Sequence, residues 1–139
     1  MKTLALFTLI LFGTSIVNAQ IQSEEITIQN KEIQLPGTLT YSQENTPLII
    51  WVHGSGPIDR NGNQPAQNVN ANYIKQFRDA VNTKNISFFS YDKRTANKEN
   101  SAFLKDTKIM DFASDAQAAV NHFKNKKIFS EIILIGHSQ

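Results

Sequence analysis

Residues 47–57 read PLIIWVHGSGP, and residues 132–139 read IILIGHSQ. In each stretch an uninterrupted apolar run leads directly into a short segment that contains glycine, histidine and serine. A strand that is buried on both faces, as in a parallel sheet, is continuously apolar rather than alternating. The two stretches therefore predict buried strands over residues 48–52 and 132–135, each followed by a polar loop at its carboxyl end.

The rest of the chain alternates strands with helices. Alternating apolar and polar residues predict a strand over residues 24–29, and short strands are expected at 38–41 and 86–91. Apolar residues at helical spacing predict helices over residues 73–81 and 109–124. Because strands alternate with helices after the third strand, the pattern indicates βαβ units and an α/β fold.

Local signals define the expected ends of these elements. Residues 35–37 (LPG) are typical of a turn. Residues 53–72 are rich in glycine, proline and asparagine, and residues 92–108 are polar and rich in lysine, so both are expected to be loops. The expected helix caps are Asn70 or Asn72 for the first helix and Asp106 or Thr107 for the second.

Residues 1–19 have the pattern of a secretory signal peptide. Lys2 precedes an apolar run over residues 4–17, which is shorter than the roughly 20 residues that span a bilayer. Val17 and Ala19 place small residues at the cleavage site. We predict cleavage after Ala19 and a secreted or periplasmic protein without a stable membrane anchor; an uncleaved anchor or a buried segment is the alternative.

The composition excludes several classes of function. The 139 residues carry 14 Lys and Arg against 12 Asp and Glu, a net charge of only +2, which gives no electrostatic case for binding nucleic acid. There is no cysteine, so disulfides, thiolate metal sites and a cysteine nucleophile are excluded. The three histidines lack the spacing of a zinc site. We expect no metal and no cofactor, and the oligomeric state is left open.

Ser138 is the candidate nucleophile. Gly136, His137 and Ser138 follow the second apolar strand and match the first part of a G-x-S-x-G nucleophile elbow. The turn in that motif is sharp and strains the serine backbone, so it needs glycine on both sides. The second glycine would follow Gln139. In this position Ser138 would attack an ester, thioester or amide carbonyl.

The loop after the first apolar strand is the candidate oxyanion loop. Glycines such as Gly54 and Gly56 let the backbone approach a substrate and direct N–H groups at a developing oxyanion. The N–H groups of Ser55 and Gln139 are the candidates, with Gly56 as the alternative to Ser55. His53 is expected to hold the shape of this loop. A glycine-rich turn without a catalytic role is the other reading.

With these two motifs in place, residues 24–139 resemble the α/β-hydrolase superfamily. The HGSGP segment followed by DRNGN at residues 59–63 is similar to the HGSGPxDRxGN loop of bacterial esterases and serine-aminopeptidase-like hydrolases. Asp92 and Arg94 are similar to the D-x-R segment of those proteins, although Thr95 stands where they usually have glycine. The resemblance implies a mostly parallel central sheet flanked by helices, with the two motifs side by side.

The resemblance implies a serine hydrolase that cleaves carboxylic esters through an acyl-enzyme, with a small-molecule ester or short peptide as substrate. A serine peptidase of the aminopeptidase or prolyl-oligopeptidase type is the alternative. A non-catalytic truncated product and an unrelated α/β binding domain are the remaining ones. The family order is serine, then Asp or Glu, then histidine. We therefore expect the acid and the base beyond Gln139, and we interpret residues 20–139 as a truncated N-terminal half of the domain that is inactive alone.

The remaining polar residues have supporting roles in this interpretation. His137 occupies the variable position of the elbow, and its side chain is expected to point away from Ser138. His122 lies on the second helix and is expected to be solvated. The charged residues expected to pair with one another and stiffen the loops, or else to be solvated, are Asp59, Arg60, Asp92 and Arg94.

Overall fold

The structure, a computed structural model, describes residues 20–138. The predicted signal peptide and Gln139 lie outside the described residues. The elements in chain order are β1 (Gln22–Asn30), β2 (Ile33–Tyr41), β3 (Leu48–Val52), the 3₁₀ turn η1 (Pro65–Gln67), α1 (Tyr73–Asn82), β4 (Ser87–Tyr91), the 3₁₀ segment η2 (Lys98–Phe103), α2 (Ile109–Lys126) and β5 (Ile132–Gly136).

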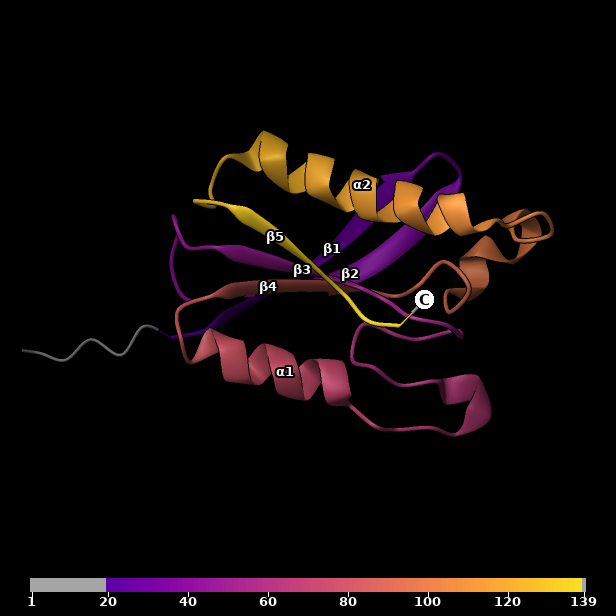
Figure 1. Ribbon diagram of the computed structural model, residues 1–139, viewed down its shortest axis with the longest axis horizontal. Coiled ribbons are helices and arrows are strands. Elements are labelled where there is room, and N and C mark those ends of the chain that lie inside the picture. Colours follow the sequence, from indigo (N-terminus) through magenta and orange to yellow (C-terminus); the bar gives the residue numbers. More distant parts are fainter. Residues whose placement is uncertain (1–19, 139) are drawn as a thin grey trace, which may run out of the picture.

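The described strands form one sheet in the order β1-β2-β4-β3-β5. β3 pairs in parallel with β4 and β5, whereas β2 pairs antiparallel with β1 and β4. One face of the sheet is covered by α1 and the other by α2 (Figure 1). The α/β fold predicted from the sequence is therefore confirmed, with parallel pairing confined to the part of the sheet that contains the two apolar strands.

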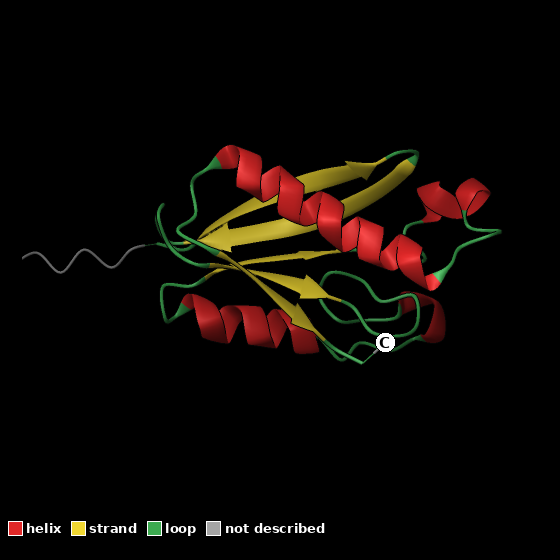
Figure 2. Ribbon diagram, turned by 45° about the horizontal axis from the view of Figure 1, so that its top comes forward, coloured by secondary structure: helices red, strands yellow, loops and turns green. Residues whose placement is uncertain are grey.

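Successive side chains of β4 pack on opposite faces of the sheet, and all five residues of this strand are buried. Phe88 packs on the α1 side in a cluster with Trp51 and Ile74. Phe89 packs on the α2 side, where its ring lies 4.8 Å from the ring of Phe123. Since helices cover both faces of the sheet (Figure 2), successive residues of a central strand are buried in turn, which removes the polar alternation of a half-exposed strand.

The predicted turn at residues 35–37 is wrong, because these residues lie inside β2. Gly37 pairs with Ile26 on one side and Tyr91 on the other. The ring of Phe89 lies over Gly37, where an added Cβ would come within 2.6 Å of ring carbon Cε2. The Pro36 carbonyl accepts a hydrogen bond from the Asp92 N–H at 2.7 Å. Pairing on both sides thus overrides the local preference for a turn.

Asn72 stands at the N-cap position of α1, as predicted, but the capping contacts differ from the prediction. Asn72 directly precedes α1, but its side-chain oxygen accepts a hydrogen bond from Asn63 and does not cap the helix. α2 begins at Ile109, and the Asp111 carboxylate accepts the N–H of Lys108 at 2.6 Å. The expected caps of α2 are therefore wrong, because the first turn of that helix supplies its own acceptor.

The segment over residues 92–108 is more than a surface loop. Lys93, Arg94 and Asn100 are buried within it. Asn100 joins the segment to β2, because its amide accepts the N–H of Gln34 and donates to the carbonyl of the same residue, both at 2.9 Å. The polar composition of the segment reflects this internal hydrogen bonding as well as exposure to solvent.

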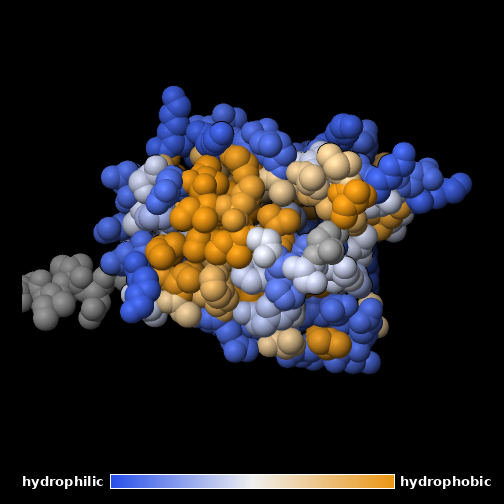
Figure 3. Space-filling model, viewed as in Figure 1, coloured by the Kyte–Doolittle hydropathy of each residue, from blue (hydrophilic) through white to orange (hydrophobic). Residues whose placement is uncertain are grey.

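β5 forms one edge of the described sheet. Ile133 and Leu134 are 38% and 52% exposed, and Figure 3 shows apolar side chains gathered over the region that β5 occupies in Figure 1. An exposed apolar edge strand is a template for pairing with another chain. Among the described helices, none is both long and apolar enough to cross a bilayer.

We predict that residues 20–139 expressed alone self-associate through β5 and are insoluble or poorly ordered. Leu134→Lys should increase the soluble monomeric fraction, because a charge at an edge opposes strand addition. Sedimentation velocity on the parent and the variant measures the monomeric fraction. Lys75→Met, on α1, is the control for a change of net charge by one unit. A parent that is monomeric and melts cooperatively would contradict the prediction.

Candidate active site

The two glycine-containing motifs lie side by side at the carboxyl-terminal ends of the parallel strands β3 and β5. Val52 and Gly136, the last residues of β3 and β5, are partners in the parallel register. Beyond them, the His137 N–H donates to the Val52 carbonyl at 3.2 Å and the Ser55 N–H donates to the Ser138 carbonyl at 3.0 Å. The structure thus brings together the loops that the sequence predicts to meet.

Gly54 is the point of closest approach between these loops. A Cβ at this position would overlap the carbonyl oxygens of His137 and Ser138, so any larger residue would force the two backbones apart. Gly56 has a φ of 97°, a value that favours glycine. At Gly136, by contrast, a Cβ would meet no described atom within 4 Å, so the described residues give no steric reason for glycine there.

Ser138 lines an apolar cavity of about 270 Å³. Its φ is 31°, in the positive region that residues other than glycine rarely adopt and that is associated with strained functional sites. α2 supplies the wall of the cavity opposite the elbow. The lining residues are Val52, His53, Ile109, Phe112, Ala113, Gly136, His137 and Ser138.

The candidate oxyanion donors differ in their surroundings and in whether the structure describes them. The Ser55 N–H is already bonded to the Ser138 carbonyl. Gly56, the neighbouring alternative, lines a second cavity with Ser55 and Lys93. Gln139 lies outside the described residues. The assignment of an oxyanion hole to Ser55 and Gln139 therefore stays a prediction.

His53 is buried at the base of the candidate oxyanion loop, 3% exposed. Its Nε2–H donates to the Tyr91 carbonyl, which leaves Nδ1 as an acceptor without a partner among residues 20–138. Burial lowers the pKa of His53 from 6.5 to about 4, so the ring is neutral at physiological pH. This geometry ties the end of β3 to the end of β4, which is the placement expected of a residue that holds the loop.

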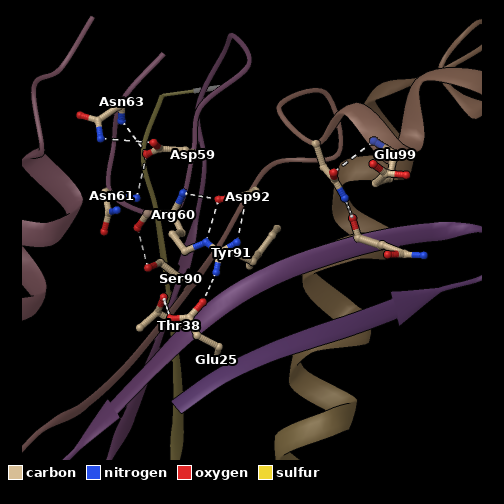
Figure 4. A network of polar contacts seen from close by, with 12 residues as sticks. Glu25, Thr38, Asp59, Arg60, Asn61, Asn63, Ser90, Tyr91, Asp92 and Glu99 are labelled. Carbon is tan, nitrogen blue, oxygen red and sulfur yellow. Dashed lines mark hydrogen bonds and ion pairs between the residues drawn. The ribbon is translucent and has the colours of Figure 1, made fainter. Parts of the chain in front are cut away.

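Arg60 and Asp92 form the expected pair between the loops. Arg60 donates from its backbone N–H and its Nε to one Asp92 oxygen, at 2.8 and 3.0 Å, and from a terminal nitrogen to the other at 2.8 Å. The hydrogen bonds to Asp92 raise the pKa of Arg60. Arg60 also contacts Glu25 of β1 (Figure 4).

Asp59 does not join this pair. Its carboxylate accepts the N–H groups of Asn61 and Asn63 at 2.9 and 2.8 Å (Figure 4). Asp59 therefore closes its own turn, and the expected pairing of Asp59 with Arg94 across the loops is wrong. The physical reason is local: backbone donors two and four residues ahead occupy the carboxylate.

Arg94 binds Asp115 on α2 and not Asp59. Its Nε and a terminal nitrogen donate to the two carboxylate oxygens at 2.7 and 2.8 Å, and the two side chains are only 6% and 2% exposed. The hydrogen bonds to Asp115 raise the pKa of Arg94. Sequence reasoning missed Asp115 because an acidic residue in a helix carries no signal of a distant partner.

Lys93 was also missed, because a lysine in a polar run is normally solvated. Its backbone N–H donates to the Ile58 carbonyl at 3.0 Å, and its ammonium donates to the Gly54 carbonyl at 2.5 Å. The ammonium also lies 4.3 Å from the centre of the Phe112 ring. The only signal in the sequence was its position between Asp92 and Arg94.

The other two histidines lie apart from these contacts. The His137 ring stacks on Trp51 at 6.1 Å and lies 5.6 Å from the Tyr73 ring, which places it toward α1. His122 is half-buried rather than solvated, with its ring 5.0 Å from that of Phe123, and burial lowers its pKa. Over residues 20–138, no three His, Asp or Glu side chains are grouped as metal ligands.

The comparisons with known proteins agree with this architecture. No family model matches the chain. It is 30% identical to Esterase EstD of Thermotoga maritima over 121 residues, which cover 84% of this chain and 27% of the esterase. It is similar in fold to the crystal structure described as "Putative hydrolase from Agrobacterium vitis S4", with a TM-score of 0.55 and 20% identity over 86% of this chain and 41% of that one.

These relatives are much longer than the matched region. The chain spans about a quarter of the esterase and less than half of the solved protein. The chain is therefore related in sequence to part of an esterase and in fold to part of a protein described as a hydrolase.

The pKa of His53 predicts a pH dependence of stability. A histidine that is neutral when folded and protonated when unfolded stabilises the fold above pH 6.5 and loses that contribution as the pH falls toward 4. The loss approaches about 1.4 kcal/mol per pH unit. Urea unfolding at pH 7 and pH 5 should show a smaller difference for His53→Gln than for the parent; equal differences would contradict the assignment.

The Arg94–Asp115 pair predicts a strong non-additivity. Arg94→Met leaves a buried carboxylate without its cation and should cost about 3–5 kcal/mol of unfolding free energy. Arg94→Met combined with Asp115→Leu should recover most of that loss, because both charges are then gone. Denaturant unfolding of the single and double variants measures the coupling, and additive losses would argue against a buried pair.

Proposed function

We propose that the whole protein is a serine hydrolase that cleaves carboxylic esters through an acyl-enzyme, with Ser138 as the nucleophile. The observation that carries the proposal is the meeting of the two loops at Gly54, where an added Cβ would overlap the backbone of the Ser138 segment. In that approach the Ser55 N–H, in the loop after β3, donates to the carbonyl of Ser138 at the end of β5 at 3.0 Å. Nucleophile and oxyanion donors need this juxtaposition.

Ser138 would attack the carbonyl carbon of the substrate and pass its proton to a base. His53 is a poor base here, because its Nε2–H is committed to Tyr91 and its pKa is lowered to about 4. His137 is stacked on Trp51. We propose that the triad histidine and its carboxylate partner follow Gln139 in the whole protein, in agreement with the family order.

The oxyanion that forms would be held by backbone N–H groups. The Ser55 N–H now donates to the Ser138 carbonyl, so that bond would have to exchange for one to the substrate oxygen. Gly56, next along the loop, and Gln139 are the other donors in the proposal. One such donor contributes about 3–4 kcal/mol of transition-state stabilisation.

The substrate proposal rests on the cavity beside Ser138. Its lining is mainly apolar and its volume is about 270 Å³, which suits a short apolar acyl group. Esterase EstD is an esterase by name, and this favours an ester over an amide. We propose further that the protein acts outside the cytoplasm, as the pattern of residues 1–19 predicts.

The test is hydrolysis of p-nitrophenyl esters of increasing acyl length by the intact protein. We expect turnover that is fastest for short acyl chains, and a loss of kcat of about 10⁴-fold or more in Ser138→Ala. Ser42→Ala, on a surface loop after β2, is the matched control and should hydrolyse at the parent rate. No ester turnover would contradict the proposal, and faster cleavage of peptide amides than of esters would favour the peptidase.

A further inference from the structure

The Gly54–Ser55 peptide is held from both sides. Its carbonyl accepts a hydrogen bond from the Lys93 ammonium at 2.5 Å, and its N–H donates to the Ser138 carbonyl at 3.0 Å. The carbonyl and the N–H of one peptide unit point in opposite directions. Lys93 therefore lies behind the peptide whose N–H faces the nucleophile elbow.

Lys93 forms no ion pair with the neighbouring carboxylates Asp92 and Asp115, because each of them is bound by an arginine. Asp92 is bound by Arg60, and Asp115 is bound by Arg94. Within residues 20–138, no carboxylate lies within ion-pair distance of the Lys93 ammonium. Lys93 is 5% exposed, so its ammonium has lost most of its water and directs its charge at the Gly54 carbonyl.

A cation on the carbonyl of an amide strengthens the N–H of the same amide as a donor, and hydrogen bonds in series polarise one another. Hydrogen bonds from a charged donor are also about twice as strong as neutral ones. The Phe112 ring, with its centre 4.3 Å from the ammonium, adds a cation–π contact that stabilises the charge. Lys93 can thus fix the direction of the Ser55 N–H and raise its donor strength.

We propose that Lys93 is a positioning residue for the oxyanion site, acting through the Gly54–Ser55 peptide. The proposal rests on the proposed function and assigns this role to a residue that does not touch the substrate. Because Lys93 holds the peptide from behind, the Ser55 N–H stays aimed at the elbow when its acceptor changes from the Ser138 carbonyl to a substrate oxygen. The backbone bond from Lys93 to Ile58 anchors the same loop further along.

The first test is spectroscopic and independent of turnover. In the intact protein labelled with ¹⁵N-serine, the Ser55 amide proton is assigned by its loss in Ser55→Ala. Lys93→Met should move this proton upfield, whereas Lys93→Arg, which keeps the charge, should retain most of the parent shift. Lys75→Met, on the outer face of α1, is the matched control and should leave it in place. An unchanged Ser55 shift in Lys93→Met overturns the proposal.

The second test separates transition-state from ground-state effects. Lys93→Met should lower kcat by about tenfold, a part of the effect of losing a whole donor, with KM within about twofold. An alkyl boronic acid, which places an oxygen in the oxyanion site, should bind more weakly by about the same factor. A rise in KM with kcat unchanged would overturn the proposal.

A second variant covers the case in which Lys93→Met does not fold. Lys93→Gln keeps a neutral donor, so its Ser55 amide proton should lie upfield of the parent position and downfield of the position in Lys93→Met where that variant folds. A shift equal to that of the parent would overturn the role of the charge. If the parent hydrolyses no ester, the proposed function fails, and the Ser55 shift still decides whether Lys93 holds the peptide.

Discussion

Four consecutive residues at the end of β4 hold the site together. The Tyr91 carbonyl binds His53, Asp92 binds Arg60, and Lys93 binds both Ile58 and Gly54. The fourth residue, Arg94, reaches the other way to Asp115 on α2. Because β4 lies beside β3 in the sheet, this short segment fixes the candidate oxyanion loop and the helix that lines the apolar cavity.

The parallel register of β3 and β5 then sets where the two loops meet. Val52 and Gly136 are paired, so the loops after β3 and β5 leave the sheet at the same level. Only glycine at position 54 allows the backbones of these two loops to approach as they do. The buried Arg94 is paired with Asp115, whereas Lys93 is directed at a peptide carbonyl. Removing one member of a buried ion pair leaves an unpaired charge and costs unfolding free energy. The positions of Arg94 and Asp115 therefore depend on each other.

The sequence was informative where burial on both faces leaves a continuous apolar run, as in residues 48–52, and where glycine follows such a run. It was misleading where a distant contact decides the local structure. Pro36 and Gly37 lie within a strand because neighbouring strands pair with them, and Phe89 packs on the bare Gly37 backbone. Lys93 carried only the signal of its position between Asp92 and Arg94, and Asp115 carried none, because their roles depend on contacts with elements far away in the chain.

We propose that Ser138, and not another serine near the loops, is the nucleophile. The most direct measurement is treatment of the intact protein with a fluorophosphonate, followed by mass spectrometry of the intact adduct and of its peptides. We expect a single adduct per molecule, located on Ser138 and abolished by Ser138→Ala. No adduct, or an adduct on Ser55, would contradict it.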